Sequence, residues 1–172
     1  MIRVGVISDT HGYFPPSVFT HFSECDEIWH AGDIGTLEVL ESLQKFRPTR
    51  AVFGNIDGQE IRQETAENLV FTIEGLKVFM THIGGYPGRY SPDARKVIDQ
   101  EKPGLFICGH SHILRVMSDP ARPGLLHMNP GAAGIHGFHK VLTVLRFTID
   151  AGKISHLQAI ELGERGKMKI SE

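Results

Sequence analysis

The sequence predicts an α/β fold with α+β character, in which two packed β-sheets are flanked by helices. Three observations support this prediction. Short apolar runs alternate with helical patterns up to residue 53, a glycine turn joins two apolar strands between residues 70 and 81, and nearly all of the chain after residue 105 is strand-like. Alternating strands and helices favour a partly parallel sheet with helices packed against it, and the later strands indicate a second sheet.

The elements before residue 54 follow the order strand, helix, strand, helix, strand. Each strand is a short apolar run that ends in a polar loop, and each helix begins at prolines or at a capping residue such as Thr36. Apolar residues recur at helical spacing from Leu37 to Phe46. The predicted bounds are 2–7, 27–30 and 50–53 for the strands and 15–22 and 37–46 for the helices.

The rest of the chain is predicted to contain a hairpin, one helix and a series of strands. Glu74-Gly75 forms the hairpin turn, and Ser91 with Pro92 marks the start of a helix that ends near Glu101. Polar residues from 163 to 172 predict a frayed tail on a single domain that covers residues 1–172. The predicted strands cover 70–73, 77–81, 105–108, 113–117, 125–128, 141–149 and 154–160.

Composition and charge narrow the class of protein. With 18 basic and 20 acidic side chains the net charge is -2, so the chain lacks the basic surplus of a non-specific DNA- or RNA-binding protein. No apolar run approaches the ~20 residues of a membrane span, and the N-terminus lacks the pattern of a secretory leader. We therefore expect a cytoplasmic protein that does not associate with membranes, in which Cys25 and Cys108 are reduced and buried.

Seven side chains with metal-binding groups follow apolar runs at which a strand is predicted to end. Each alone has an ordinary explanation, such as a turn for Asn55 or a satisfied histidine for His82. The histidines at 110 and 112 point to the same side if their segment is extended. Because ligand sites in such folds gather at the carboxyl ends of strands, the whole set predicts a site for two divalent metals. The seven residues are Asp9, His11, Asp33, Asn55, His82, His110 and His112.

The motifs SDTHG, GD, GN, TH and GHSH, in this order between Ser8 and His112, resemble those of the calcineurin-like metallophosphoesterase superfamily. The short chain, GNID and the sequence NPGAAG are most similar to its small bacterial and archaeal phosphodiesterases of the YfcE/MJ0936 type. The resemblance implies a four-layer αββα sandwich of two mixed β-sheets flanked by helices. It also implies two divalent metal ions as cofactors, with manganese favoured and iron, zinc, nickel or cobalt as alternatives.

The resemblance assigns a role to each of the seven residues. Asp33 would bridge the two metals together with a hydroxide, which would attack the phosphorus. Four residues would then be catalytic through the metals and this hydroxide, namely Asp33, Asn55, His110 and His112. The implied ligands are Asp9, His11 and His112 for one metal and Asn55, His82 and His110 for the other, with Asp33 shared.

One departure from the larger superfamily concerns the leaving group. Many members have a histidine after Gly-Asn that can protonate it, whereas this chain has Ile56, which cannot donate a proton. Esters with acidic leaving groups, or help from another side chain or a metal-bound water, are therefore favoured. Thr36 also replaces an acidic residue that many members have three positions after Gly-Asp.

The expected function is hydrolysis of a small phosphodiester, which could be derived from a nucleotide, without stable binding of nucleic acid. Two alternatives are left open: a phosphomonoesterase that acts on a small metabolite, and a non-catalytic protein-binding scaffold of the same fold. The retromer-subunit branch of the family is such a scaffold and lacks the histidine that matches His82, which this chain retains. The resemblance also leaves a homo-oligomer open.

A few further residues are candidates for supporting roles. His30 is either a hydrogen-bonding partner of the site or an ordinary buried strand histidine. His136 and His139 are expected on the surface of a loop. Arg89 is a candidate phosphate contact, although a solvated loop arginine is the favoured interpretation.

Overall fold

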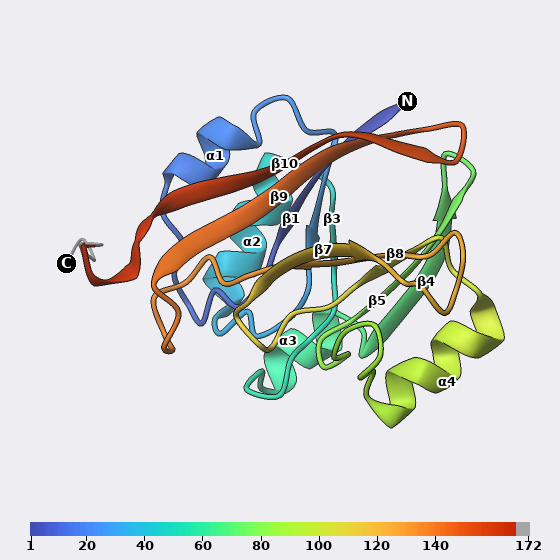
Figure 1. Cartoon of the computed structure of the whole chain (residues 1–172). Coiled ribbons are helices and arrows are strands. Elements are labelled where there is room, and N and C mark those ends of the chain that lie inside the picture. The colour runs from blue at the N-terminus through green and yellow to red at the C-terminus, as the bar shows by residue number, and fades with distance from the viewer. Residues whose placement is uncertain (168–172) are drawn as a thin grey trace.

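Two five-stranded β-sheets lie face to face in the computed structural model, which describes residues 1–167 (Figure 1). Short loops join most of the elements, and a 3-10 turn at Arg165–Lys167 follows the last strand. The elements are β1 (Ile2–Ile7), α1 (Ser17–His21), β2 (Glu27–His30), α2 (Leu37–Phe46), β3 (Thr49–Ala51), α3 (Gln59–Glu64), β4 (Asn68–Ile73), β5 (Leu76–Thr81), α4 (Pro92–Glu101), β6 (Leu105–Ile107), β7 (Leu114–Ser118), β8 (Leu126–Pro130), β9 (Val141–Asp150) and β10 (Lys153–Glu164).

Both sheets are mixed, as predicted. The first has the order β10-β9-β1-β2-β3, in which β1, β2 and β3 are parallel and β9 and β10 are antiparallel additions. The second has the order β4-β5-β6-β8-β7, in which β5, β6 and β8 are parallel. The predicted hairpin across Glu74-Gly75 is confirmed by the antiparallel pairing of β4 with β5.

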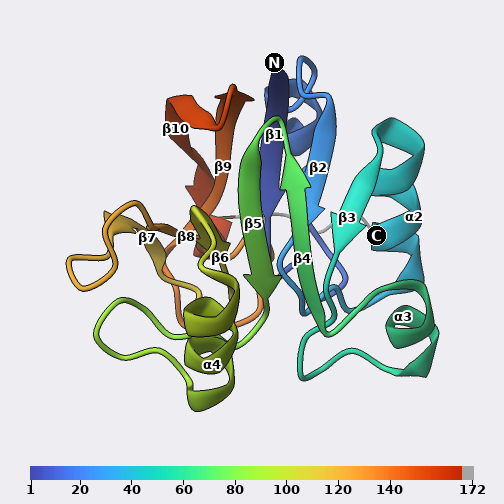
Figure 2. The ribbon, with the colours of Figure 1, turned by 90° about the vertical axis from the view of Figure 1, so that its right-hand side faces the viewer.

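Three apolar clusters hold the layers together and confirm the αββα sandwich. The central cluster, which includes Val4, Trp29, Val78 and Met80, is fully buried between the two sheets. A second cluster packs α1, α2 and α3 against the first sheet, and a third packs α4 against the second sheet. Figure 1 accordingly shows α1 and α2 on one side of the molecule and α4 on the other, and Figure 2 shows β4 and β5 in front of β1 and β2.

The helices begin largely where their caps predict. The Thr36 hydroxyl accepts a hydrogen bond from the Val39 N–H at the start of α2, and Ser91 does the same for Ala94 at the start of α4. The helix α3 was not predicted, because it has no side-chain cap and buries only Ile61. No helix within residues 1–167 is long and apolar enough to cross a membrane.

The C-terminal segment differs from its prediction. A frayed tail was expected from residue 163, but β10 continues to Glu164, which pairs with Val141 of β9. The 3-10 turn then follows, and the Arg165 N–H donates to the Lys140 carbonyl. The prediction is therefore wrong for residues 163 and 164, because cross-strand pairing with β9 continues β10 through a polar sequence, and residues 165–167 form a turn. Residues 168–172 lie outside the described part of the chain.

Two histidines, His30 and His127, are completely buried in strands of the two sheets. Burial disfavours the charged imidazolium and lowers the pKa of each to about 4, from an ordinary value of 6.5. Both side chains are therefore neutral at physiological pH. Between pH 6.5 and about pH 4 each histidine is protonated in the unfolded chain but neutral in the folded protein. Each histidine therefore lowers the free energy of unfolding as the pH falls through this range.

We predict that His127→Gln flattens the pH dependence of stability. Between about pH 7.5 and pH 5, the wild type should lose about 2 kcal/mol more unfolding free energy than the variant, because its His127 takes up a proton on unfolding in addition to His30, which both proteins keep. Urea unfolding in the presence of a chelator measures both losses without a contribution from bound metal. Equal losses in the two proteins would show that His127 titrates normally in the folded state.

Candidate metal centre

Loops that follow strands of both sheets meet at one edge of the sandwich. In the first sheet, the Asp9 N–H donates to the Gly32 carbonyl (3.0 Å) and the His11 N–H donates to the Asp33 carbonyl (2.9 Å). In the second, the Gly109 N–H donates to the His82 carbonyl (3.0 Å). The two sheets are joined at this edge by Asp9, whose Oδ2 accepts a hydrogen bond from the His110 N–H (3.0 Å).

All seven predicted residues lie together at this edge. Six of them form two groups, and within each group one ligand atom per residue lies within 4.8 Å of the others. The seventh, Asn55, belongs beside the second group, since its Oδ1 is 3.1 Å from His110 Nδ1. The first group is Asp9, His11 and His112, and the second is Asp33, His82 and His110.

The two groups are adjacent, and Asp33 faces both. Its Oδ2 lies 3.1 Å from Nε2 of His82, in its own group, and 3.5 Å from Nε2 of His11, in the other group. Asp9 Oδ1 likewise lies 3.2 Å from His112 Nε2 and 3.8 Å from His82 Nε2. Such mutual proximity is what two metal sites that share a carboxylate require.

The backbone at the site is unusual, because five of the seven residues have positive φ angles. The values are 53° for Asp9, 45° for His11, 54° for Asp33, 74° for His110 and 61° for His112. A left-handed conformation costs a non-glycine residue about 1 kcal/mol or more. The segment across His110 and His112 is therefore not extended, and these two histidines reach different groups from a bent loop.

The chemistry of the donor set fits divalent metals. Three buried atoms, Asp9 Oδ1, His11 Nε2 and His82 Nε2, make no hydrogen bond within residues 1–167. His82 Nδ1 lies 2.7 Å from the Ala31 carbonyl, so its N–H is committed there and Nε2 is left to bind a cation. Buried polar atoms without partners are costly, and metal ions at these positions would satisfy all three.

Charge also favours cations at this edge. Burial opposes ionisation of Asp9, but His112, His82 and Ser8 outweigh it and hold the pKa of this carboxyl below its usual value. Burial of Asp33 is outweighed in the same way, chiefly by His82, and its pKa is also lowered. The site therefore holds two buried carboxylates in their anionic form.

A second layer of side chains orients the metal-binding groups. His139 Nε2 donates to the Gly134 carbonyl (2.7 Å), so its Nδ1 accepts the Nδ1 proton of His112 (3.2 Å). The ring of His112 is thereby held with Nε2 aimed at Asp9. His139 was expected on the surface and is instead part of the site, where it fixes the tautomer of His112. His136 is exposed as expected, but its ring stacks on His11 at a centroid distance of 4.7 Å.

His30 is a hydrogen-bonding support for the same loops. Its Nδ1 accepts from the Gly32 N–H (3.0 Å), so its Nε2–H donates to the Thr10 hydroxyl (3.0 Å), which in turn donates to the Ile34 carbonyl (2.9 Å). The first of the two interpretations of His30 is therefore the one that the structure supports.

Asp57 is a supporting residue that the sequence did not reveal. Its carboxylate accepts hydrogen bonds from the N–H groups of Ile34, Gly35 and Gly54 (3.1, 2.8 and 2.8 Å), and so ties the Asn55 loop to the Asp33 loop. Gly54 permits this approach, because a Cβ there would overlap Asp33 Oδ1. The only signal in the sequence was an acidic residue two positions after Asn55.

Comparison with known proteins agrees with this fold and site. The sequence profile of the calcineurin-like phosphoesterase superfamily domain matches residues 2–152. A probable metallophosphoesterase of Methanothermobacter thermautotrophicus is 31% identical over 136 residues, which cover 75% of this chain and 76% of the relative. The chain therefore belongs to the calcineurin-like phosphoesterase superfamily, and it is a probable metallophosphoesterase.

Solved structures share the fold at lower identity. Vps29 of Entamoeba histolytica, in complex with Zn²⁺, superposes with a TM-score of 0.69 at 19% identity, covering 95% of this chain and 99% of that one. A novel archaeal phosphodiesterase superposes with a TM-score of 0.70 at 20% identity, covering 94% of this chain and all of that one. At these identities the likeness establishes the αββα architecture alone.

We predict that Asp33→Ala lowers metal affinity more than about 100-fold, because loss of a group that only orients a ligand already costs about 10- to 100-fold. Plasma mass spectrometry after dialysis against manganese measures the bound metal. Asp150→Ala, which removes an exposed carboxylate at the end of β9, is the control and should keep the wild-type metal content. Full metal content and activity in Asp33→Ala would contradict the assignment of this residue.

Proposed function

We propose that the protein is a dinuclear metal-dependent phosphodiesterase. Asp33 contacts residues of both groups and is the proposed shared ligand. When bound, two divalent ions supply the chemistry, because they neutralise the phosphate oxygens and lower the pKa of the attacking water. The proposed ligands are Asp9, His11 and His112 for one ion and Asn55, His82 and His110 for the other, with Asp33 shared.

The residues of the chain prepare the site for that chemistry. Asp9 and Asp33 provide anionic charge in a buried place, which favours cations over water there. Ala31 and His139 hold the rings of His82 and His112 with Nε2 toward the site. The left-handed loops fix these groups before substrate arrives, so little reorganisation is needed.

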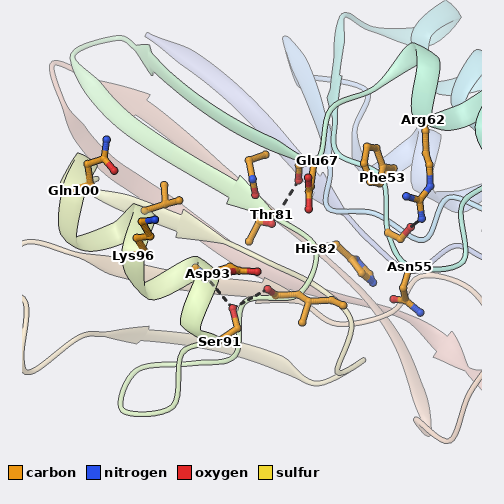
Figure 3. A pocket seen from close by; sticks show the side chains of 15 residues that line it. Phe53, Asn55, Arg62, Glu67, Thr81, His82, Ser91, Asp93, Lys96 and Gln100 are labelled. Atoms are coloured by element: carbon orange, nitrogen blue, oxygen red, sulfur yellow. Dashed lines mark hydrogen bonds between the residues drawn. The ribbon is translucent and has the colours of Figure 1, made fainter.

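The observation that carries the phosphodiester assignment is a pair of pockets that share Ile83 and border the same part of the site, at Asn55, His82 and His110. The larger, of about 600 Å³, is bordered by Asn55 and His82, with α4 on its opposite wall (Figure 3). The smaller, of about 270 Å³, is bordered by His110. Ile83 lies between them and borders both. A phosphodiester has two substituents, and the two pockets give each a place.

Ile56 supports a diester over a simple monoester. Its side chain is 47% exposed next to Asn55, and its N–H donates to Asp33 Oδ1 (3.1 Å). The backbone of Ile56 therefore contacts the site, and its side chain offers no proton to a leaving alkoxide. Substrates with acidic leaving groups need no such proton. The phosphomonoesterase and the non-catalytic scaffold are the alternatives that activity measurements would separate.

Further details of the proposal follow from the same chemistry. Manganese is the first metal to test, although the Zn²⁺ complex of Vps29 shows that zinc belongs in the same trial. The name of the archaeal phosphodiesterase agrees with a diester substrate. We propose a small, nucleotide-derived diester and a cytoplasmic location, without stable binding of nucleic acid or membranes.

We predict that purified protein hydrolyses bis-p-nitrophenyl phosphate, but not p-nitrophenyl phosphate, once manganese is restored after chelation. Chelation should abolish the activity, because the buried carboxylates and imidazoles cannot activate water unaided. Release of p-nitrophenolate reports both reactions in parallel. Cleavage of the monoester alone would favour the phosphomonoesterase, and cleavage of neither, with metal bound, would favour the scaffold.

We predict that Ile56→His raises turnover of an alkyl phosphate relative to p-nitrophenyl phosphate by about tenfold or more, because general acid catalysis contributes ~10²–10⁴-fold to loss of an alkoxide, whereas p-nitrophenolate leaves without a proton. The ratio of kcat/KM for the alkyl phosphate and the p-nitrophenyl ester measures the effect. Ile56→Gln is the matched control, since it adds a polar side chain of similar length without a titratable proton. An unchanged ratio in Ile56→His would remove leaving-group protonation as the basis of the preference.

A further inference from the structure

The smaller pocket, which is bordered by His110, contains two cationic side chains to which the proposed function gives no role. Two arginines line it, Arg89 from the loop after β5 and Arg115 from β7. Within the described residues, none of the lining side chains is a carboxylate, and neither arginine forms an ion pair. Two cationic groups without an anion beside a metal site are suited to a second negative charge of the substrate.

The two arginines differ in how firmly they are held. The guanidinium of Arg115 stacks on the ring of Tyr86, 4.2 Å from its centroid, and so has a fixed plane at the pocket wall. Arg89 is exposed in a loop whose turn is closed by its own N–H, which donates to the Tyr86 carbonyl (2.8 Å). One arginine is thus in place, and the other can close on a bound group.

Polar groups at the base of the pocket are available as well. His127 is completely buried where it lines the pocket, and neither ring nitrogen has a hydrogen-bond partner within the described chain. The Ser111 hydroxyl accepts from Asn129 Nδ2 and from the Ile113 N–H (both 3.2 Å), so its own proton is left to donate.

The larger pocket has a different charge balance. Its cationic side chains, Arg62 and Lys96, are matched by Glu67 and Asp93. Arg62 is moreover committed, since its Nε donates to the Asp57 carbonyl (2.6 Å) and its guanidinium stacks on Phe53. The larger pocket is therefore suited to an uncharged substituent, and the smaller one to an anion.

We propose that the smaller pocket binds a second phosphate of the substrate, linked through an oxygen to the phosphorus that is attacked. The substrate class is then a pyrophosphate-linked diester, in which two organic groups are joined by a P–O–P bridge. This inference rests on the proposed phosphodiesterase and narrows its substrate. Arg115 and Arg89 would be the residues that determine specificity.

The reaction balances without a proton donor at position 56. Water adds to one phosphorus, the bond between that phosphorus and the bridging oxygen breaks, and the second phosphate leaves with the electron pair. The products are two phosphate monoesters, and the protons of the water are released to solvent. A phosphate leaving group ionises near neutral pH, so it departs as an anion that the arginines stabilise, and Ile56 is no obstacle.

The test compares three substrates. Dithymidine 5′,5′-diphosphate has the P–O–P bridge, the p-nitrophenyl ester of thymidine 5′-phosphate has the nucleoside without a second phosphate, and bis-p-nitrophenyl phosphate has neither. We predict that Arg115→Gln lowers kcat/KM for the diphosphate by at least about tenfold and for the other two by less than about twofold, because a hydrogen bond to a charged group is lost only with the first.

Controls make the result unambiguous. Arg89→Gln should show the same selectivity with a smaller loss, and Lys153→Gln, which removes an exposed charge at the start of β10, should leave all three substrates unchanged. Circular dichroism melting establishes that each variant is folded. If the wild type hydrolyses the p-nitrophenyl esters and not the diphosphate, this inference is overturned, whereas the proposed phosphodiesterase function stands.

The remaining outcomes are equally decisive. If the wild type cleaves the diphosphate but Arg115→Gln and Arg89→Gln do so equally well, the pocket does not bind the second phosphate. Equal losses on all three substrates would mean that the arginines act on the attacked phosphate instead. If the metal-loaded wild type cleaves no substrate, the proposed function itself fails.

Discussion

The carboxylate of Asp9 is the group on which the arrangement of the site depends. It is fully buried, and its Oδ2 accepts hydrogen bonds from the Ser8 hydroxyl (2.7 Å) and from the His110 N–H (3.0 Å) in the opposite sheet. Its Oδ1 faces the imidazoles of His112 and His82 and has no hydrogen bond. One oxygen thus holds the two sheets together at this edge, and the other is left for a cation. Burial of such a charge is costly unless it is paired, so the histidines and the expected metals also stabilise the junction.

The loops around Asp9 have left-handed residues because they must turn sharply where the two sheets meet. A strand end that must place two metal-binding side chains within a few residues has to reverse direction sharply, and left-handed residues provide such a reversal. Hydrogen bonds between loops, such as that from His11 N–H to the Asp33 carbonyl, offset the cost. Asp57 adds three more backbone contacts at the Gly54 turn. The site is therefore rigid because backbone groups of neighbouring loops satisfy one another.

The metal-binding residues and the pockets have different parts in function. The former follow strand ends within the αββα core, in the part of the chain that matches the superfamily. The pockets border this set at Asn55, His82 and His110, but large parts of their walls come from α4, the Gly84–Ser91 loop and β7. The two pockets differ in charge, since carboxylates accompany the cationic side chains in the larger one and not in the smaller one.

The sequence by itself determined the layers of the fold and predicted the seven side chains that the structure brings together at one edge. Apolar periodicity, caps at Thr36 and Ser91, and polar groups at strand ends are local signals, and local signals can be found in a linear chain. It did not determine α3, whose only buried residue is Ile61, or the continuation of β10 to Glu164, which depends on pairing with β9.

Only the tertiary structure decided which side chains support that set. His139 meets His112 across 27 positions, and Asp57 reaches the backbone of Ile34 across 23. The charge difference between the pockets likewise arises where Arg115 of β7 meets the loop that follows β5. Such contacts join segments that are distant in sequence, and no periodicity or spacing encodes them; they exist because two sheets place their strand ends at one edge.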